Sequence, residues 1–96
     1  MDLLFSPRAL DDLAAMQTYI AERDSPERAE AFISGIIARC EALVGFPAIG
    51  RDRSDLRPGL RTLAAKPGII VAYDISPSHV VVLRIHSSDR DWERDS

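Results

Sequence analysis

The stretch that decides the fold is residues 60–87, LRTLAAKPGIIVAYDISPSHVVVLRIHS. It divides into three runs rich in β-branched residues, 60–65, 69–75 and 79–87. The turn-forming sequences Lys66-Pro67-Gly68 and Ser76-Pro77-Ser78 separate these runs. Connections this short join neighbouring antiparallel strands. The stretch therefore predicts a meander of three antiparallel strands.

Before the meander, the hydrophobic pattern predicts a short strand and two helices. An apolar run at 3–5 is followed by Ser6-Pro7, and the pair Ser25-Pro26 recurs after the first helix. In each pair the serine hydroxyl can cap free backbone N–H groups, and proline suits the first helical position. The first apolar stripe includes Leu10 and Leu13. Two helices joined this tightly must turn back on each other.

Length and composition bound the fold. A chain of 96 residues is too short for two hydrophobic cores, and its 46% hydrophobic content is enough for one. We therefore expect residues 1–96 to form a single α+β domain. Its N-terminal strand and helical hairpin pack on a three- to four-stranded antiparallel sheet.

The charge distribution favours a local basic patch on an acidic molecule. The formal net charge is −3 and the pI is about 5.2, which argues against a surface built broadly for nucleic acid. Between residues 51 and 66, however, five basic side chains face only two acidic ones. The five are Arg51, Arg53, Arg57, Arg61 and Lys66. This segment is either a solvated loop or a contact surface for an acidic partner.

Other classes of protein lack support in the sequence. Cys40 lies on the apolar stripe of the second helix, which favours a core thiol over a nucleophile. Neither a metal-ligand spacing nor a phosphate-binding glycine loop is present, so we expect no metal and no cofactor. A single cysteine, the absence of a leader and the absence of a long apolar run predict a cytoplasmic protein without membrane contact.

The last strand carries a continuous apolar run with consequences for both faces of the sheet. Alternation directs Val80 and Val82 to one face and Val81, Leu83 and Ile85 to the other. One helical hairpin covers only one face, so a protein partner is expected on the other. The alternative cover is the C-terminal segment that contains Trp92.

A catalytic interpretation rests on Arg84 and His86, which lie two apart on one strand. A ribonuclease could use His86 as acid or base and Arg84 or Arg61 to stabilise phosphorane-like charge. The structural alternative is favoured, with His86 hydrogen-bonded and Arg84 paired to a carboxylate such as Asp74 or Asp89. Tyr73 is expected to be half-buried with an exposed hydroxyl.

Four segments together resemble the ParE branch of the ParE/RelE toxin superfamily. They are Phe5 to Leu13 with Tyr19-Ile20, Ala31-Phe32 through Leu43 into Phe46 to Arg51, Leu56 to Arg61, and Leu83 to His86 with Asp89 to Asp91. The resemblance implies a toxin of a type II toxin–antitoxin (plasmid stabilisation) system. It is neutralised by a ParD-like antitoxin encoded beside it, in a hetero-oligomeric complex.

The resemblance also implies a target. ParE toxins poison DNA gyrase, an action that needs no catalytic residue, whereas RelE toxins cut messenger RNA on the ribosome. A degenerate toxin that acts only as antitoxin partner is a third alternative. We expect Arg51, Arg57, Arg61, Val80, Val82 and Arg84 to contact the antitoxin. The resemblance makes Asp89, Arg90, Asp91 and Trp92 candidates for target contact.

Overall fold

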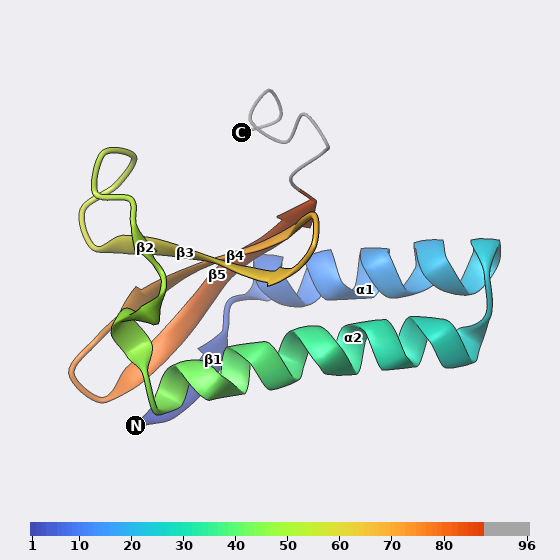
Figure 1. The fold of residues 1–96 in the computed structure, drawn as a ribbon, viewed down its shortest axis with the longest axis horizontal. Helices are drawn as coiled ribbons and strands as arrows, with labels where there is room; N and C mark the ends of the chain where they lie inside the picture. Colours follow the sequence, from blue (N-terminus) through green and yellow to red (C-terminus); the bar gives the residue numbers. More distant parts are fainter. Residues whose placement is uncertain (88–96) are drawn as a thin grey trace.

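The computed structural model describes residues 1–87, which form one sheet, one helical hairpin and one core (Figure 1). The elements in chain order are β1 (Asp2–Phe5), α1 (Pro7–Arg23), α2 (Pro26–Glu41), the 3-10 turns η1 (Ala42–Val44) and η2 (Pro47–Ile49), β2 (Arg51–Asp52), β3 (Leu60–Lys66), β4 (Ile69–Ile75) and β5 (His79–Ser87).

The sheet confirms the meander and adds a strand at each edge. Its order is β1-β5-β4-β3-β2, and β3, β4 and β5 pair antiparallel. The N-terminal strand β1 runs parallel to β5, and the two-residue strand β2 pairs with β3. The α+β class is confirmed, with a five-stranded mixed sheet in place of the expected three- to four-stranded antiparallel one. A parallel β1 is possible because the whole helical hairpin separates it from the meander.

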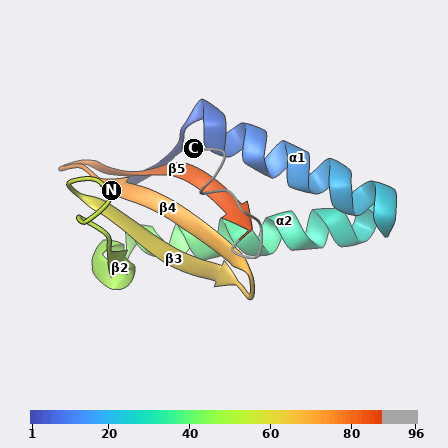
Figure 2. The same cartoon turned by 90° about the horizontal axis from the view of Figure 1, so that it is seen from above.

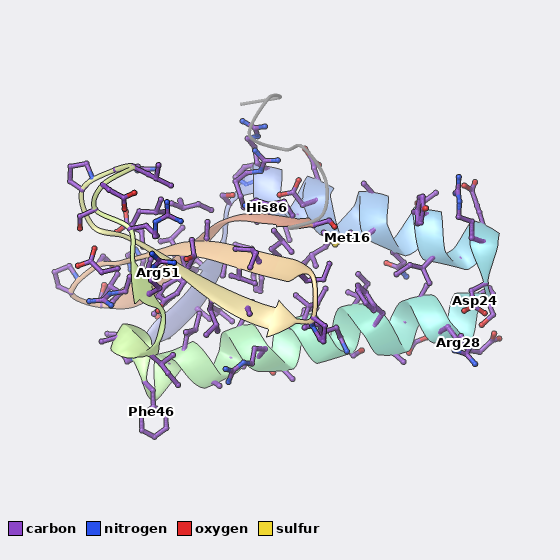
Figure 3. The ribbon with its side chains drawn as sticks, turned by 45° about the horizontal axis from the view of Figure 1, so that its top comes forward. Met16, Asp24, Arg28, Phe46, Arg51 and His86 are labelled. Carbon is purple, nitrogen blue, oxygen red and sulfur yellow. The ribbon has the colours of Figure 1, made fainter. Side chains whose placement is uncertain are left out.

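Both helices begin where the serine–proline pairs predict. The Ser6 hydroxyl accepts a hydrogen bond from the Ala9 N–H at 3.1 Å, and the Ser25 hydroxyl accepts one from the Arg28 N–H at 3.1 Å. At the tip of the hairpin, Arg28 lies 3.4 Å from Asp24 (Figure 3). This tip extends well beyond the sheet, as two perpendicular views show (Figures 1 and 2).

The core lies between the hairpin and one face of the sheet. The helices and η1 contribute Ala9, Leu13, Ile36, Cys40 and Leu43, and the sheet contributes Leu63, Ile69, Val71, Tyr73, Val80, Val82 and Ile85. Leu10 is 53% exposed, so its place on the buried stripe was predicted wrongly. The buried positions of α1 are Ala9 and Leu13, which are four residues apart on one face of the helix. Leu10 lies beside this face and is directed away from the core.

A bulge in β5 changes which of its residues face the core. Residues 72 and 73 of β4 pair with Arg84 and Val82, so Leu83 is an extra residue between them. The extra residue returns Ile85 to the face of Val80 and Val82, and all three are buried against the helices. The prediction that Ile85 lies opposite Val80 and Val82 is therefore wrong.

The other face of the sheet carries apolar side chains outside this core. Leu4 is paired with Val81 across β1 and β5, and Leu4 is 47% exposed. Neither side chain belongs to the core cluster. Among residues 1–87, no helix is long and apolar enough to cross a membrane.

Candidate functional site

A buried tyrosine fastens the chain segment that leaves the second helix. The Tyr73 hydroxyl donates a hydrogen bond to the Pro47 carbonyl at 2.7 Å and accepts one from the Gly50 N–H at 2.9 Å. Tyr73 is completely buried, so the expectation of an exposed hydroxyl is wrong. The ring belongs to the core, and its hydroxyl bonds the first residue of η2, Pro47, and the residue that follows η2, Gly50. Burial raises the pKa of Tyr73 above its ordinary value of 10.0, so the hydroxyl stays a donor.

Arg61 holds the same segment from the neighbouring strand. It is the cross-strand partner of Tyr73 in the β3–β4 ladder. Its Nη1 donates to the Gly50 carbonyl at 2.9 Å and to the Ala48 carbonyl at 3.3 Å. The guanidinium predicted to contact a partner is thus already engaged within the chain.

Gly50 is the residue that permits this close approach. A Cβ atom placed on Gly50 would lie 2.7 Å from Cε1 of the Tyr73 ring and 2.8 Å from the Thr62 carbonyl oxygen. Contacts shorter than 3 Å are absent from ordinary packing, and neither backbone nor a buried ring moves readily. Gly50 is therefore required by space, because its φ of −72° is open to any residue.

The following loop neutralises part of its own charge. The Arg53 guanidinium donates two hydrogen bonds of 3.1 Å to the Asp55 carboxylate, which lowers the pKa of Asp55. Asp52 accepts hydrogen bonds from the Ser54 hydroxyl and N–H, which lower the pKa of Asp52. These contacts are exposed and therefore stabilise the loop only weakly.

Two arginines of this region remain presented to solvent. Arg57 Nη2 lies 3.9 Å from Asp74, a contact at the limit of an ion pair. Arg51 is exposed on β2, and its charge contributes to lowering the pKa of Asp55. Arg51 and Arg57 are therefore exposed in the structure, and their contact with an antitoxin stays a prediction.

Large apolar side chains accompany these cations. Phe46 is 71% exposed, Ile49 is 55% exposed and Leu56 is 58% exposed. Phe46 points away from the ribbon into solvent (Figure 3). The sequence analysis did not identify Phe46 and Ile49 as exposed side chains. No signal in the sequence marks them, because Ile49 follows Phe46 at the i+3 spacing that is typical of a buried helical stripe.

Arg84 joins the last strand to the first helix. Its Nε donates to Asp12 Oδ2 at 2.9 Å and its Nη2 lies 3.3 Å from Asp12 Oδ1. Asp12 Oδ2 also accepts the Ile85 N–H at 2.8 Å. Arg84 therefore pairs with a carboxylate, but with Asp12 in place of the predicted Asp74 or Asp89. Nothing in the sequence marks Asp12 as the partner of Arg84.

The three residues of the hypothetical nuclease site do not converge. Arg84 and His86 pair with residues 72 and 70 of β4, whereas Arg61 pairs with residue 73. Side chains alternate along a strand, so Arg61 lies on the face opposite to Arg84 and His86. His86 is buried, and Arg84 is held by Asp12.

Other predicted site residues are inaccessible or lie outside the described range. Val80 and Val82 are completely buried, because the face they occupy is the one the helices cover, and a partner cannot reach them in this structure. Asp89, Arg90, Asp91 and Trp92 lie outside the described residues.

Cys40 is a core residue, as its position on the helical stripe predicts. It is completely buried, and burial, with a smaller contribution from the Glu41 charge, raises its pKa from 9.0 to about 11. Residues 1–87 contain no cluster of three His, Cys, Asp or Glu side chains that could bind a metal.

The known proteins that this chain resembles are toxins. The family model described as "ParE toxin of type II toxin-antitoxin system, parDE" matches residues 3–92. Toxin ParE3 of Caulobacter vibrioides is 40% identical over 74 residues, covering 77% of this chain and 73% of that protein. Toxin RelE3 of the same organism is 32% identical over 85 residues, covering 88% of this chain and 91% of that protein.

A solved structure shares the fold. The structure titled "Chromosomal ParDE TA system from P. aeruginosa" superposes with a TM-score of 0.81. The match covers 93% of this chain and 97% of the other at 23% sequence identity. At 23% identity the likeness shows that the two chains share an arrangement of helices and strands.

Proposed function

The chain belongs to the ParE toxin family of type II toxin–antitoxin systems, and from this premise we propose that it poisons DNA gyrase and is neutralised by a ParD-like antitoxin. The single observation that carries the choice of target is the separation of Arg61 from Arg84 and His86 on opposite faces of the sheet. A toxin that acts by binding needs no catalytic constellation.

The contacts that Arg61 and Arg84 make within the chain also support gyrase as the target. Stabilisation of charge on a reacting phosphate requires cations that reach the phosphoryl oxygens. Arg84 is instead bound to Asp12, and Arg61 to two backbone carbonyls. Overall the chain is acidic, with a single lysine, Lys66. This charge balance suits a protein target better than a ribosomal RNA surface.

Cleavage of messenger RNA is the second candidate. The 32% identity to Toxin RelE3 favours it, as does the position of Arg84 and His86 on the same face. For this activity the Asp12–Arg84 pair would have to open on the ribosome. An inactive family member that serves only as antitoxin partner is a third outcome of the same experiments.

We propose that the antitoxin covers the open face of the sheet and adds a strand at an exposed edge, forming a hetero-oligomer in the cytoplasm. Leu4 and Val81 supply apolar surface there, and β1 and the two-residue β2 are the edge strands. Hydrophobic burial supplies most of the affinity, while the ordering of a disordered antitoxin segment opposes it. Arg51 and Arg57 provide the charges for antitoxin carboxylates.

The target-contact proposal for Asp89 to Trp92 has its own test. Deletion of residues 89–96 is expected to reduce toxicity while leaving antitoxin affinity unchanged. Loss of antitoxin binding in the deleted chain would show that this segment serves the complex or the fold.

The experiment for the target combines purified chain, gyrase and plasmid DNA, with and without the antitoxin encoded beside the toxin. We expect gyrase-dependent accumulation of cleaved DNA and loss of supercoiling, both reversed by antitoxin. Gyrase omitted from the mixture is the control, because a contaminating nuclease would cut DNA without it. Normal supercoiling in the presence of excess folded chain would contradict the proposal.

A further inference from the structure

We propose that residues 46–51, called here the anchor loop, form a preorganised docking site for an acidic, apolar segment of the antitoxin. Phe46 and Ile49 enter apolar contact with that segment, and Arg51 pairs with one of its carboxylates. This proposal rests on the proposed function, since it names the part of the toxin surface where the antitoxin is anchored.

The apolar content of the anchor loop is the first observation. Phe46 and Ile49 lie within one short turn, in which the Ile49 N–H donates to the Phe46 carbonyl at 3.1 Å. Both side chains are more than half exposed, and Phe46 is the most exposed large hydrophobic residue of the described chain. Aromatic side chains and arginine are enriched at the centre of protein interfaces, and Phe46 and Arg51 supply one of each in the anchor loop.

The rigidity of the anchor loop is the second observation. The Tyr73 hydroxyl joins Pro47 to Gly50, and the Arg61 guanidinium adds bonds to Ala48 and Gly50. At its start, the Phe46 N–H donates to the Ala42 carbonyl at 3.2 Å. A loop fixed in advance loses little conformational entropy when a partner binds, so its exposed side chains contribute more to affinity.

Charge identifies the occupant. Residues 46–61 contain four arginines and two aspartates, whereas the rest of the chain contains eight basic and thirteen acidic residues. An acidic segment is therefore attracted to this region and repelled elsewhere. In a symmetric dimer through the same surface, the arginines of two copies would face each other, which disfavours a second copy of this chain.

The test measures the affinity of the purified neighbouring antitoxin for variants of the full chain by isothermal titration calorimetry. The double variant Phe46→Ala/Ile49→Ala removes the apolar anchors, and Arg51→Glu reverses the charge. We expect each to weaken binding by about 30-fold or more, the range of interface hot spots. Raising the salt concentration should diminish the effect of Arg51→Glu on affinity, because salt screens charges. The effect of Phe46→Ala/Ile49→Ala should not change with salt.

Matched controls lie on other surfaces of the same protein. Leu10→Ala and Tyr19→Ala remove apolar side chains of similar exposure on α1. Arg39→Glu reverses an exposed charge on α2. These variants should bind the antitoxin within about 3-fold of the unmodified chain, a difference below about 1 kcal/mol. Circular dichroism and thermal unfolding establish that every variant is folded.

The outcomes separate this proposal from the proposed function. If the unmodified chain does not bind the antitoxin, the proposed function fails before the anchor loop is tested. If it binds and the anchor-loop variants bind equally well, the anchor proposal alone is wrong. Loss of gyrase poisoning with unchanged antitoxin affinity would assign the loop to the target and overturn the proposal. A change of the free chain from dimer to monomer would assign it to self-association, with the same consequence.

Discussion

Arg84 and Asp12 are 72 residues apart in the sequence and meet through two contacts, Nε to Oδ2 at 2.9 Å and Nη2 to Oδ1 at 3.3 Å. The same carboxylate accepts the Ile85 N–H at 2.8 Å. Strand β1 ends at Phe5, so beyond that point Asp12 takes the place of a strand at this edge of β5. One side chain thereby fixes the first helix to the last strand.

Asp12→Ala is expected to destabilise the protein by about 2 kcal/mol, because it leaves a partly buried guanidinium and the Ile85 N–H without their acceptor. Urea denaturation measures the loss. Asp12→Asn retains a carbonyl acceptor and should lose less. Asp11→Ala, at the exposed neighbouring position, is the matched control and should remain within about 0.5 kcal/mol of the unmodified chain. Equal effects at Asp11 and Asp12 would contradict the role assigned to the ion pair.

Tyr73→Phe removes only the hydroxyl that joins Pro47 to Gly50. A buried N–H then loses its acceptor, so we expect a loss of about 1–3 kcal/mol in the free energy of unfolding. Faster amide hydrogen exchange at Gly50 should accompany it. Tyr19→Phe is the control, since Tyr19 is 51% exposed and makes its contact to Arg23 through the ring. Unchanged exchange at Gly50 in Tyr73→Phe would argue against a fastened loop.

Gly50→Ala tests the close approach between the loop and the sheet. The new Cβ collides with the Tyr73 ring and the Thr62 carbonyl, and overpacking of this kind costs about 1–3 kcal/mol. Gly45→Ala should be neutral or slightly stabilising, because its nearest neighbour is the Ala42 carbonyl oxygen at 3.8 Å. Thermal unfolding of the two variants compares them directly. A tolerated alanine at position 50 would show that the loop is not held against Tyr73.

The Cys40 thiol should be unreactive in the folded protein. A pKa of about 11 in place of 9.0 lowers the thiolate fraction at about pH 8 roughly a hundredfold, and burial blocks access as well. Reaction with Ellman's reagent, in native buffer and in denaturant, measures both effects. Rapid reaction in native buffer would contradict the core position of Cys40.

The same pKa shift predicts a pH dependence of stability. The folded protein keeps the thiol proton of Cys40, which the unfolded chain releases above about pH 9. The stability that this difference contributes is therefore fully present below about pH 9. It is lost as the pH rises from about 9 to about 11. Cys40→Ala, which lacks the group, should show a shallower decline over this interval. Parallel pH profiles for the two proteins would contradict the assigned shift.

The elements of the fold were largely predictable from local signals. The serine–proline pairs located both helix starts, and the two turn sequences located the boundaries of β4 and β5. These features act within a few residues, so one sequence suffices to find them. Strand β2 was missed because two residues have no periodicity, and the pairing of β1 with β5 depends on contacts across the whole chain.

The candidate site was harder to predict for the same reason. Leu83 forms a bulge that reverses the face of Ile85, and simple alternation cannot show it. Arg61 and Arg84 were identified as important, but their partners are backbone carbonyls and Asp12, which only the folded chain brings near. Exposure of Phe46 and Ile49 likewise depends on where the chain leaves η1.

The most direct test of a toxin that acts by binding is made in cells that express the chain, with the antitoxin induced afterwards. In one culture, gyrase-linked breaks in DNA and the 5′ ends of messenger RNA are measured together. The account predicts DNA breaks that disappear when antitoxin is induced, intact messages, and the same result for His86→Ala. Cut messages without gyrase-linked breaks, abolished by His86→Ala, would contradict it.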